Sequence, residues 1–283
     1  MRITSLIENT SQGHLPVEHG LSLFVEMDNG LKILFDMGQG KLFDQNAQEL
    51  NLSIAEVDLA IVSHGHYDHG GGLHTFLNKN QKANVYVHHD AFLPHFSLRE
   101  NGIRYIGLDE NLRNNPRLVL CQDVMHIAPE LTLIGNVEGN MLPPAGNRLL
   151  YGPTMKEQDM FQHEQSLIIE EGNHSVLFAG CAHRGIVNII EKAKKVLGHA
   201  PTHVFGGFHL VKSGLTEEKE TDFLKQLAAK LLQYDCTYYT MHCTGLPAYE
   251  QLKKLMKERI GYLACGDRVS IKGLPNGNAV IRR

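Results

Sequence analysis

The stretch His64-Gly65-His66-Tyr67-Asp68-His69 decides the fold prediction, because it places four side chains that can bind metal within six residues. It follows residues 58–63, whose apolar centre Leu-Ala-Ile-Val predicts a buried β-strand. Histidines two apart on an extended backbone point the same way, so His64 and His66 can bind one ion together. Asp68 and His69 lie past the turn, where they can face a second ion.

Three glycines, Gly70-Gly71-Gly72, come directly after this run. Glycine allows a sharp turn and a close approach of the backbone to a site. A polar turn with accidental histidines is the alternative interpretation. The coincidence of a strand end, four ligand-type residues and three glycines favours a metal site.

Three later histidines occur in a similar context, just past the end of a predicted buried strand. They are His183, His209 and His242. Because strand ends in α/β folds converge on one rim, we expect all three to reach the turn at residues 64–69. Each taken alone would also fit a structural histidine.

Two further residues near these strands have less certain roles. His163 precedes the predicted strand at residues 166–169 and is a candidate ligand or substrate contact. Cys181 could bind metal as a thiolate, but the favoured interpretation is that it packs as a small apolar residue. The other histidines, among them His88 and His95, lack this context and are assigned to the surface or to supporting positions.

The remaining chain alternates short apolar segments with segments of helical spacing. Strands are predicted over residues 3–7, 21–26, 31–35, 58–63, 85–87, 166–169, 175–179, 202–205 and 237–241. Helices are predicted over residues 41–50, 71–77, 186–197, 217–233 and 247–259. Asp28-Asn29-Gly30 is a hairpin signal between two of the strands. This order predicts an α/β protein with two sheets face to face and helices outside.

Two segments show little periodicity. Residues 92–116 are polar and irregular, and residues 137–165 contain Gly, Asn and the pair Pro143-Pro144. Long loops inside a compact domain are uncommon and usually functional, so we expect the second segment to cover a substrate.

Composition narrows the class of protein. A chain of 283 residues can bury a large core, and we expect residues 1–283 to form a single domain. The net charge of −4 and the lack of a basic run disfavour nucleic acid and anionic membranes as partners, which leaves a small-molecule substrate. Five cysteines with no C-x-x-C pair, no signal-peptide pattern at the start and no long apolar stretch predict a cytoplasmic protein.

The run HGHYDH resembles the H-x-H-x-D-H signature of the metallo-β-lactamase superfamily, and Asp36 in ILFDMGQG resembles an acidic turn that supports the metal site in that family. Further segments, GCAHRGIVNII at 180–190, GGFHL at 206–210 and HCTG at 242–245, are similar to the subfamily of archaeal dihydropterin ribofuranosyl-aminobenzene phosphate synthases. The resemblance implies an αββα sandwich of two mixed β-sheets flanked by helices, with the metals at one edge.

The resemblance also implies a ligand set. His64, His66 and His183 would bind one ion, and Asp68, His69 and His209 the other. His242 would contact a substrate phosphate or oxyanion. Many superfamily members have a bridging aspartate where this chain has Gly180-Cys181, which puts the shared ligand in doubt.

The function expected from this set is metal-dependent hydrolysis of a small, phosphorylated or pterin-like substrate by a pair of zinc ions, with Mn²⁺ or Fe²⁺ as alternatives. Two ions about 3.5–4 Å apart can activate water, with Asp68 orienting the nucleophile. An iron-dependent oxidoreductase of the dioxygenase type and a phosphodiesterase or nuclease are the competing hypotheses. Diiron flavoproteins of the fold typically have Glu where this chain has His66, which disfavours that branch.

Overall fold

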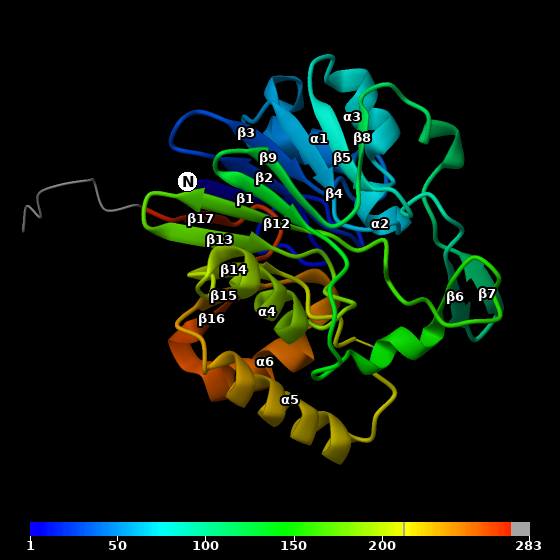
Figure 1. The fold of residues 1–283 in the computed structure, drawn as a ribbon, viewed down its shortest axis with the longest axis vertical. Helices are drawn as coiled ribbons and strands as arrows, with labels where there is room; N and C mark the ends of the chain where they lie inside the picture. The colour runs from blue at the N-terminus through cyan, green and yellow to red at the C-terminus, as the bar shows by residue number, and fades with distance from the viewer. Residues whose placement is uncertain (212, 273–283) are drawn as a thin grey trace, which may run out of the picture.

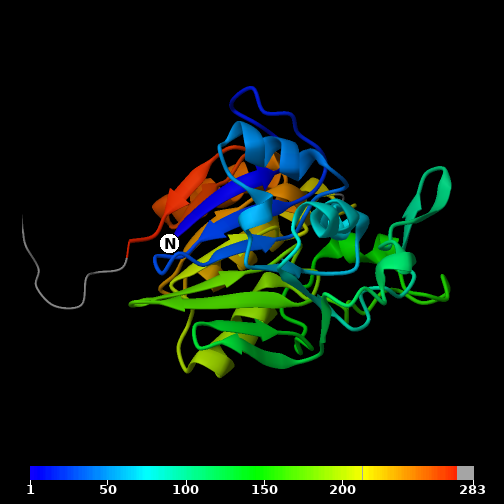
Figure 2. The same ribbon diagram turned by 90° about the horizontal axis from the view of Figure 1, so that it is seen from above.

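Two seven-stranded β-sheets lie face to face in the computed structural model, which describes residues 1–211 and 213–272 (Figures 1 and 2). The first sheet has the order β17-β1-β2-β3-β4-β5-β8, from Arg268–Ser270, Arg2–Ile7, Ser22–Glu26, Lys32–Phe35, Leu59–Val62, Asn84–His88 and Leu118–Cys121. The second has the order β16-β15-β14-β13-β12-β10-β9, from Ile260–Tyr262, Thr237–Thr240, His203–Gly206, His174–Phe178, Ser166–Glu171, Leu131–Ile134 and Val124–Ala128. Both sheets mix parallel and antiparallel pairs.

Helices cover the outer faces of both sheets. They are α1 (Leu42–Glu49), α2 (Tyr67–Gly70), α3 (Leu73–Lys79), α4 (Ile186–Leu197), α5 (Glu217–Leu231) and α6 (Leu246–Met256). Short 3₁₀ helices occur at Ile54–Glu56, Glu110–Leu112, Ala145–Leu149, His242–Thr244 and Lys257–Arg259. Helices α1 and α3 pack on the first sheet, and α4, α5 and α6 pack on the second. The predicted αββα sandwich of two mixed sheets is confirmed.

Successive side chains of the central strands enter two different cores, one between the sheets and one under the helices, which explains why these strands are continuous apolar runs in the sequence. In β4, Leu59 and Ile61 face the second sheet, whereas Ala60 and Val62 face the helices. In β13, Val176 and Phe178 likewise join the core between the sheets, while Leu177 packs under the helices. Successive side chains of a strand point to opposite faces, and here both faces are buried.

The predicted hairpin at Asp28-Asn29-Gly30 joins β2 to β3, which pair antiparallel. Gly30 has φ +90°, a backbone conformation that glycine adopts without strain. The amide of Gly30 donates to the carbonyl oxygen of Met27, and Met27 and Leu31 close the turn. The hairpin predicted at this turn is therefore confirmed.

The segments predicted as irregular contain a small third sheet. Strands β6 (Phe96–Arg99) and β7 (Gly102–Tyr105) form a hairpin, and β11 (Leu150–Tyr151), from the predicted long loop, pairs with β6. The hairpin stands out from the body of the molecule in both views (Figures 1 and 2). These strands are short and largely exposed, so they lack the apolar pattern by which a buried strand is predicted.

No helix in the described part of the chain is both long and apolar enough to cross a membrane.

One buried histidine of the first sheet, His88 at the end of β5, generates a prediction about stability. Its Nε2 donates to the carbonyl oxygen of Gln122 at 3.0 Å, and its Nδ1 accepts from the amide of Asp90 at 3.2 Å. The second bond requires the neutral ring, because a protonated Nδ1 cannot accept. Burial, with the neighbouring His89, lowers the pKa of His88 to about 4.

Because the unfolded chain binds this proton near its ordinary pKa of about 6.5, His88 should stabilise the fold above that pH, and the contribution should be lost as the pH falls toward 4. Between pH 7 and pH 5 the loss from this group is about 2 kcal/mol at most. Urea unfolding of the metal-free protein should show that His88→Gln reduces the drop in stability over this range, whereas His14→Gln, an exposed position, does not. An unchanged pH dependence in His88→Gln would contradict the prediction.

Candidate metal centre

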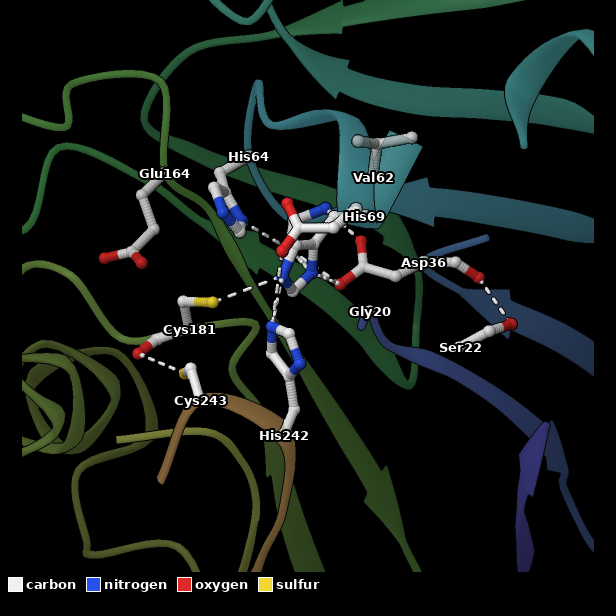
Figure 3. Close-up of polar contacts among 12 residues, drawn as sticks. Gly20, Ser22, Asp36, Val62, His64, His69, Glu164, Cys181, His242 and Cys243 are labelled. Carbon is white, nitrogen blue, oxygen red and sulfur yellow. Dashed lines mark hydrogen bonds and ion pairs between the residues drawn. The ribbon is translucent and has the colours of Figure 1, made fainter. Parts of the chain in front are cut away.

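The predicted metal-binding side chains meet at one end of the sandwich, where strands of both sheets stop. The turn that carries His64, His66, Asp68 and His69 follows β4 of the first sheet. Cys181 and His183 follow β13, His209 follows β14 and His242 follows β15, all of the second sheet. Figure 3 shows His69 between the Asp36 carboxylate and His242, with the Cys181 sulfur directed at its ring. The expectation that the strand ends converge is met.

Asp36 anchors the two histidines at the ends of the first-sheet turn. His69 Nδ1 lies 2.7 Å from Asp36 Oδ2, and Ser63 Oγ donates to the same oxygen at 2.7 Å. Because the Ser63 proton is used in this way, its oxygen can accept from His64 Nδ1, 2.9 Å away. Each ring therefore keeps a proton on Nδ1 and directs Nε2 to the interior. The predicted supporting role of Asp36 has a direct structural basis here.

Two asparagines act in the same way on the second sheet. His183 Nδ1 lies 3.0 Å from Asn147 Oδ1, and His242 Nδ1 lies 2.9 Å from Asn9 Oδ1. An amide oxygen only accepts, so both rings carry the proton on Nδ1. Four imidazoles thus have their tautomers fixed so that Nε2 is free to bind a cation.

Orphaned nitrogens show that the first group fits a metal ion. His64, His66 and His183 each have a buried Nε2 without a hydrogen-bond partner in the described part of the chain. Their donor atoms all lie within 4.8 Å of one another. A buried nitrogen without a partner costs free energy unless something absent from the protein itself binds it. Three imidazoles are also a typical ligand set for zinc.

A second group surrounds His69. Its Nε2 lies 3.2 Å from His242 Nε2, so a proton or a cation must lie between the two nitrogens. Asp68 Oδ2 lies 3.6 Å from His242 Nε2, and the Cys181 sulfur lies 3.1 Å from His69 Nε2. Facing lone pairs repel unless a proton or a cation lies between them. This group therefore also fits a metal ion.

Cys181 lies at the centre of the donor set. It shares groups of mutually close donor atoms with His64 and His69, with His183 and His209, and with His242 and Cys243. It is 3 % exposed. Apolar packing was the favoured expectation for this thiol, whereas its sulfur lies among donor atoms of histidines from both sheets.

His209 and His242 are placed differently from the ligand set that the family resemblance implied. His209 lies against His183, with ring centroids 4.2 Å apart, and its donor group contains Cys181 and His183. His242 is the histidine beside His69 and Asp68. The geometry thus favours His242 over His209 as a partner of His69, although both reach the centre.

His163 does not point a free nitrogen at either group. Its Nδ1 accepts from the amide of Gly65 at 2.9 Å, and its Nε2 lies 3.1 Å from Asp159 Oδ2. His95 Nδ1 lies 2.9 Å from the same oxygen. Neither Asp159 nor His95 was singled out from the sequence, because both come from the segments that showed no periodicity.

Electrostatics keep most of the imidazoles neutral, which is the state that binds metal. Burial lowers the pKa of His64, His183 and His242 well below its ordinary value, and neighbouring imidazoles lower it further. His69 differs: burial lowers its pKa, but the charge and the hydrogen bond of Asp36 outweigh this and raise it to about 9. Burial raises the pKa of Asp68, yet the hydrogen bond from His19 and the charge of His69 hold it well below its usual range.

The turns that carry these side chains have strained backbones. Asp36, Ala182, His209 and His242 all have φ between +49° and +61°. Residues other than glycine adopt this region at a cost, and they do so most often at functional sites.

Buried Glu164 accepts from the amides of His183 and Arg184 at 2.7 and 2.8 Å, and so holds the turn after Cys181.

A cavity of about 120 Å³ opens onto the centre and is lined by His66, Asp68, Cys181, His183 and His242, among others. Beside it lies a wider groove of about 1050 Å³ under the β6–β7 hairpin. The two share Ser97, Arg99 and Leu149. The metal centre is therefore reached from a cleft much larger than the cavity itself.

Comparison with known proteins agrees with this architecture. Residues 15–193 match the family model of the metallo-beta-lactamase superfamily. Two proteins of Methanocaldococcus jannaschii are similar over nearly their whole length. The uncharacterized protein MJ0448 is 31 % identical over 264 residues, covering 89 % of this chain and 94 % of the relative. The 7,8-dihydropterin-6-methyl-4-(beta-D-ribofuranosyl)-aminobenzene-5'-phosphate synthase is 28 % identical over 286 residues, covering 94 % and 95 %.

Among solved structures, Tm1679, described as a metal-dependent hydrolase of the beta-lactamase superfamily, aligns with a TM-score of 0.79 at 29 % identity, over 96 % of this chain and 99 % of that one. The resemblance inferred from HGHYDH and from the three later segments is thereby confirmed. On the evidence of the matched family model, the two facing sheets and the histidine turn at the end of β4, the chain belongs to the metallo-β-lactamase superfamily.

Proposed function

We propose that this protein is a metal-dependent hydrolase that binds two divalent ions, with zinc preferred over Mn²⁺ or Fe²⁺. The observation that carries the proposal is the set of four imidazoles whose Nδ1 atoms are tied to Ser63, Asp36, Asn147 and Asn9. All four present Nε2 toward the end of the sandwich. Imidazole and thiolate donors are those that suit zinc.

Within this proposal, His64, His66 and His183 hold one ion, and Asp68, His69 and His242 hold the other. The second set departs from the sequence-based expectation, because His242 lies 3.2 Å from His69. Cys181 occupies the position between the two sets. His209, beside His183, is left free to contact a substrate.

A pair of such ions, when bound, lowers the pKa of water toward neutrality and neutralises developing negative charge. The protein's own residues supply orientation. Asp68 accepts a hydrogen bond from His19, whose side chain is 52 % exposed at the mouth of the cavity, at 3.2 Å. This bond leaves the Asp68 carboxylate fixed and ionised, so that it can orient a nucleophile by accepting a hydrogen bond from it.

The size of the cavity bears on the substrate. About 120 Å³ admits the reacting group, while the rest of a substrate must extend into the groove. Arg99, Arg104 and Arg148 line that groove and form no ion pair with a carboxylate in residues 1–211 and 213–272. Unpaired guanidinium groups suit phosphate oxygens, and the curated relative is named as a phosphate synthase. A small phosphorylated or pterin-like substrate, with its anionic end in the groove, is the favoured class.

Replacement of His66 by Ala removes one of the three first-group nitrogens. We expect His66→Ala to lose metal and to lose hydrolysis of 4-nitrophenyl phosphate and bis(4-nitrophenyl) phosphate together. Metal content by plasma mass spectrometry and the absorbance of nitrophenol measure the two effects, with His14→Ala as an exposed control. Full metal content and wild-type turnover in His66→Ala would sink the assignment.

Cys181 should contribute a sulfur ligand. The cobalt-substituted protein is expected to show a sulfur-to-cobalt charge-transfer absorption that Cys181→Ser abolishes and Cys243→Ser retains. Cys181→Asp, which introduces the carboxylate found in many superfamily members, should bind two ions without this absorption. Persistence of the band in Cys181→Ser would show that Cys181 is not a ligand.

The arginine-lined groove should bind phosphate independently of the metals. We expect the double variant Arg99→Gln/Arg104→Gln to bind ribose 5-phosphate about tenfold more weakly than the wild type, as measured by calorimetry on metal-free protein. Lys225→Gln/Lys230→Gln removes the same charge from helix α5 and should have no effect. Equal affinity in both double variants, or tighter binding of a short DNA duplex than of ribose 5-phosphate, would refute a small-phosphate groove.

A further inference from the structure

A second buried network lies beside the metal centre, on the side of the long connection before β12. It contains His95 and His163, each 2 % exposed, and Asp159, whose side chain is 7 % exposed. Asp159 Oδ2 lies 2.9 Å from His95 Nδ1 and 3.1 Å from His163 Nε2, and Asp159 Oδ1 accepts from the amide of Phe161 at 2.7 Å. One carboxylate thus accepts three hydrogen bonds.

This network could be mistaken for a further ion site, because donor atoms of His66, His95, Asp159 and His163 lie within 4.8 Å of one another. The protons argue otherwise. His163 Nδ1 accepts from the amide of Gly65, so the single proton of the neutral ring lies on Nε2, between that nitrogen and Asp159. An ion at Nε2 would move the proton to Nδ1, where it would face the Gly65 N–H.

The positions of the protons instead show which group of the network donates to which. His163 links Asp159 to the backbone of Gly65: its Nε2 donates to Asp159, and its Nδ1 accepts from the Gly65 amide, which lies between His64 and His66. His95 donates to Asp159 through Nδ1, which leaves its own Nε2 as a lone pair. That nitrogen is buried and has no partner in the described residues, and the Nε2 of His66 is in the same condition.

Packing at Gly65 shows how closely these parts fit. A Cβ at this position would lie 2.7 Å from His95 Nε2 and 2.3 Å from the carbonyl oxygen of Ala91. The rings of His66 and His95 are in edge contact, with centroids 5.7 Å apart. His95 therefore lies directly against the turn that bears His64 and His66, and its ring packs edge-on against the ring of His66.

We propose that Asp159 is a positioning residue that sets the geometry of the His64–His66 turn, chiefly through His163 on the backbone amide of Gly65, with His95, which it also holds, packed against the His66 ring. The inference rests on the proposed metal centre but not on the reaction that it catalyses. Asp159 and His163 hold the amide between the two ligand histidines, and His95 packs edge-on against the His66 ring. Outer contacts of this kind orient metal ligands.

The burial of Asp159 agrees with a permanent charge at this point. Burial raises the pKa of the Asp159 carboxyl, but hydrogen bonds from His163 and His95 outweigh it and hold the pKa well below its usual range. An ionised carboxylate is the stronger acceptor, so both imidazoles are held firmly.

The decisive measurement is metal affinity, obtained by competition with a chromophoric chelator, together with the ligand-field spectrum of the cobalt-substituted protein. Asp159→Asn keeps the shape but places an amide against two N–H donors. We expect metal affinity to fall about ten- to a hundredfold and the cobalt spectrum to shift. Asp222→Asn, an exposed position on α5, is the matched control and should leave both unchanged.

His163 offers a second pair of variants. In His163→Asn a carbonyl oxygen can replace Nδ1 and accept from Gly65, whereas His163→Leu removes the acceptor. We expect His163→Asn to retain more metal affinity than His163→Leu, even if both lose stability. Wild-type affinity and spectrum in Asp159→Asn, or equal losses in the two His163 variants, would overturn the proposal. Neither readout needs a substrate, so a failure of the hydrolase proposal is detected separately.

Discussion

The hydrogen bonds that fix the Nδ1 protons of His64, His69, His183 and His242 are the constraint on which the metal centre depends. Each ring is held by an acceptor, the adjacent Ser63 for His64 and a residue distant in sequence for the other three, and without that acceptor the proton could move to Nε2 and block the site. The buried lone pairs are costly in the protein alone. The fold therefore provides a site whose unsatisfied polarity a cation would meet, as expected where stability is given up for function.

The architecture makes this arrangement attainable. The central strands of each sheet are buried on both faces, so they are held rigidly between the inner core and the outer helices. Turns with strained backbones follow directly at the strand ends, where Asp36, Ala182 and His242 adopt positive φ. Rigid strands allow such turns to persist, and the turns direct side chains from two sheets to one point.

The sequence predicted the parts of this structure that have a regular signal. The strand before HGHYDH, the hairpin at Asp28-Asn29-Gly30 and helix α4 follow from apolar period and turn chemistry, and α4 runs from Ile186 to Leu197 as predicted. His209 and His242 could not be distinguished, because both follow a buried strand, and which of them lies beside His69 is set by tertiary contacts.

Other parts lacked any local signal. Cys181 looked like a small apolar residue, because it comes close to His69 only when the two sheets pack together, and the two residues are far apart in the sequence. Asp159 and His95 come from aperiodic segments whose structure is set by tertiary contacts, so their convergence on Gly65 was invisible before the fold was known.

The donors at the end of the sandwich come from residues as far apart as His64 and His242 and from both sheets. Any ion held there acts as a cross-link that closes a long loop of the unfolded chain, and it binds the folded chain in preference to the unfolded one. Folding and metal capture are then thermodynamically linked. The supply of metal in the surroundings would set how much of the protein persists, and depletion by a chelator would act on its lifetime as well as on its chemistry.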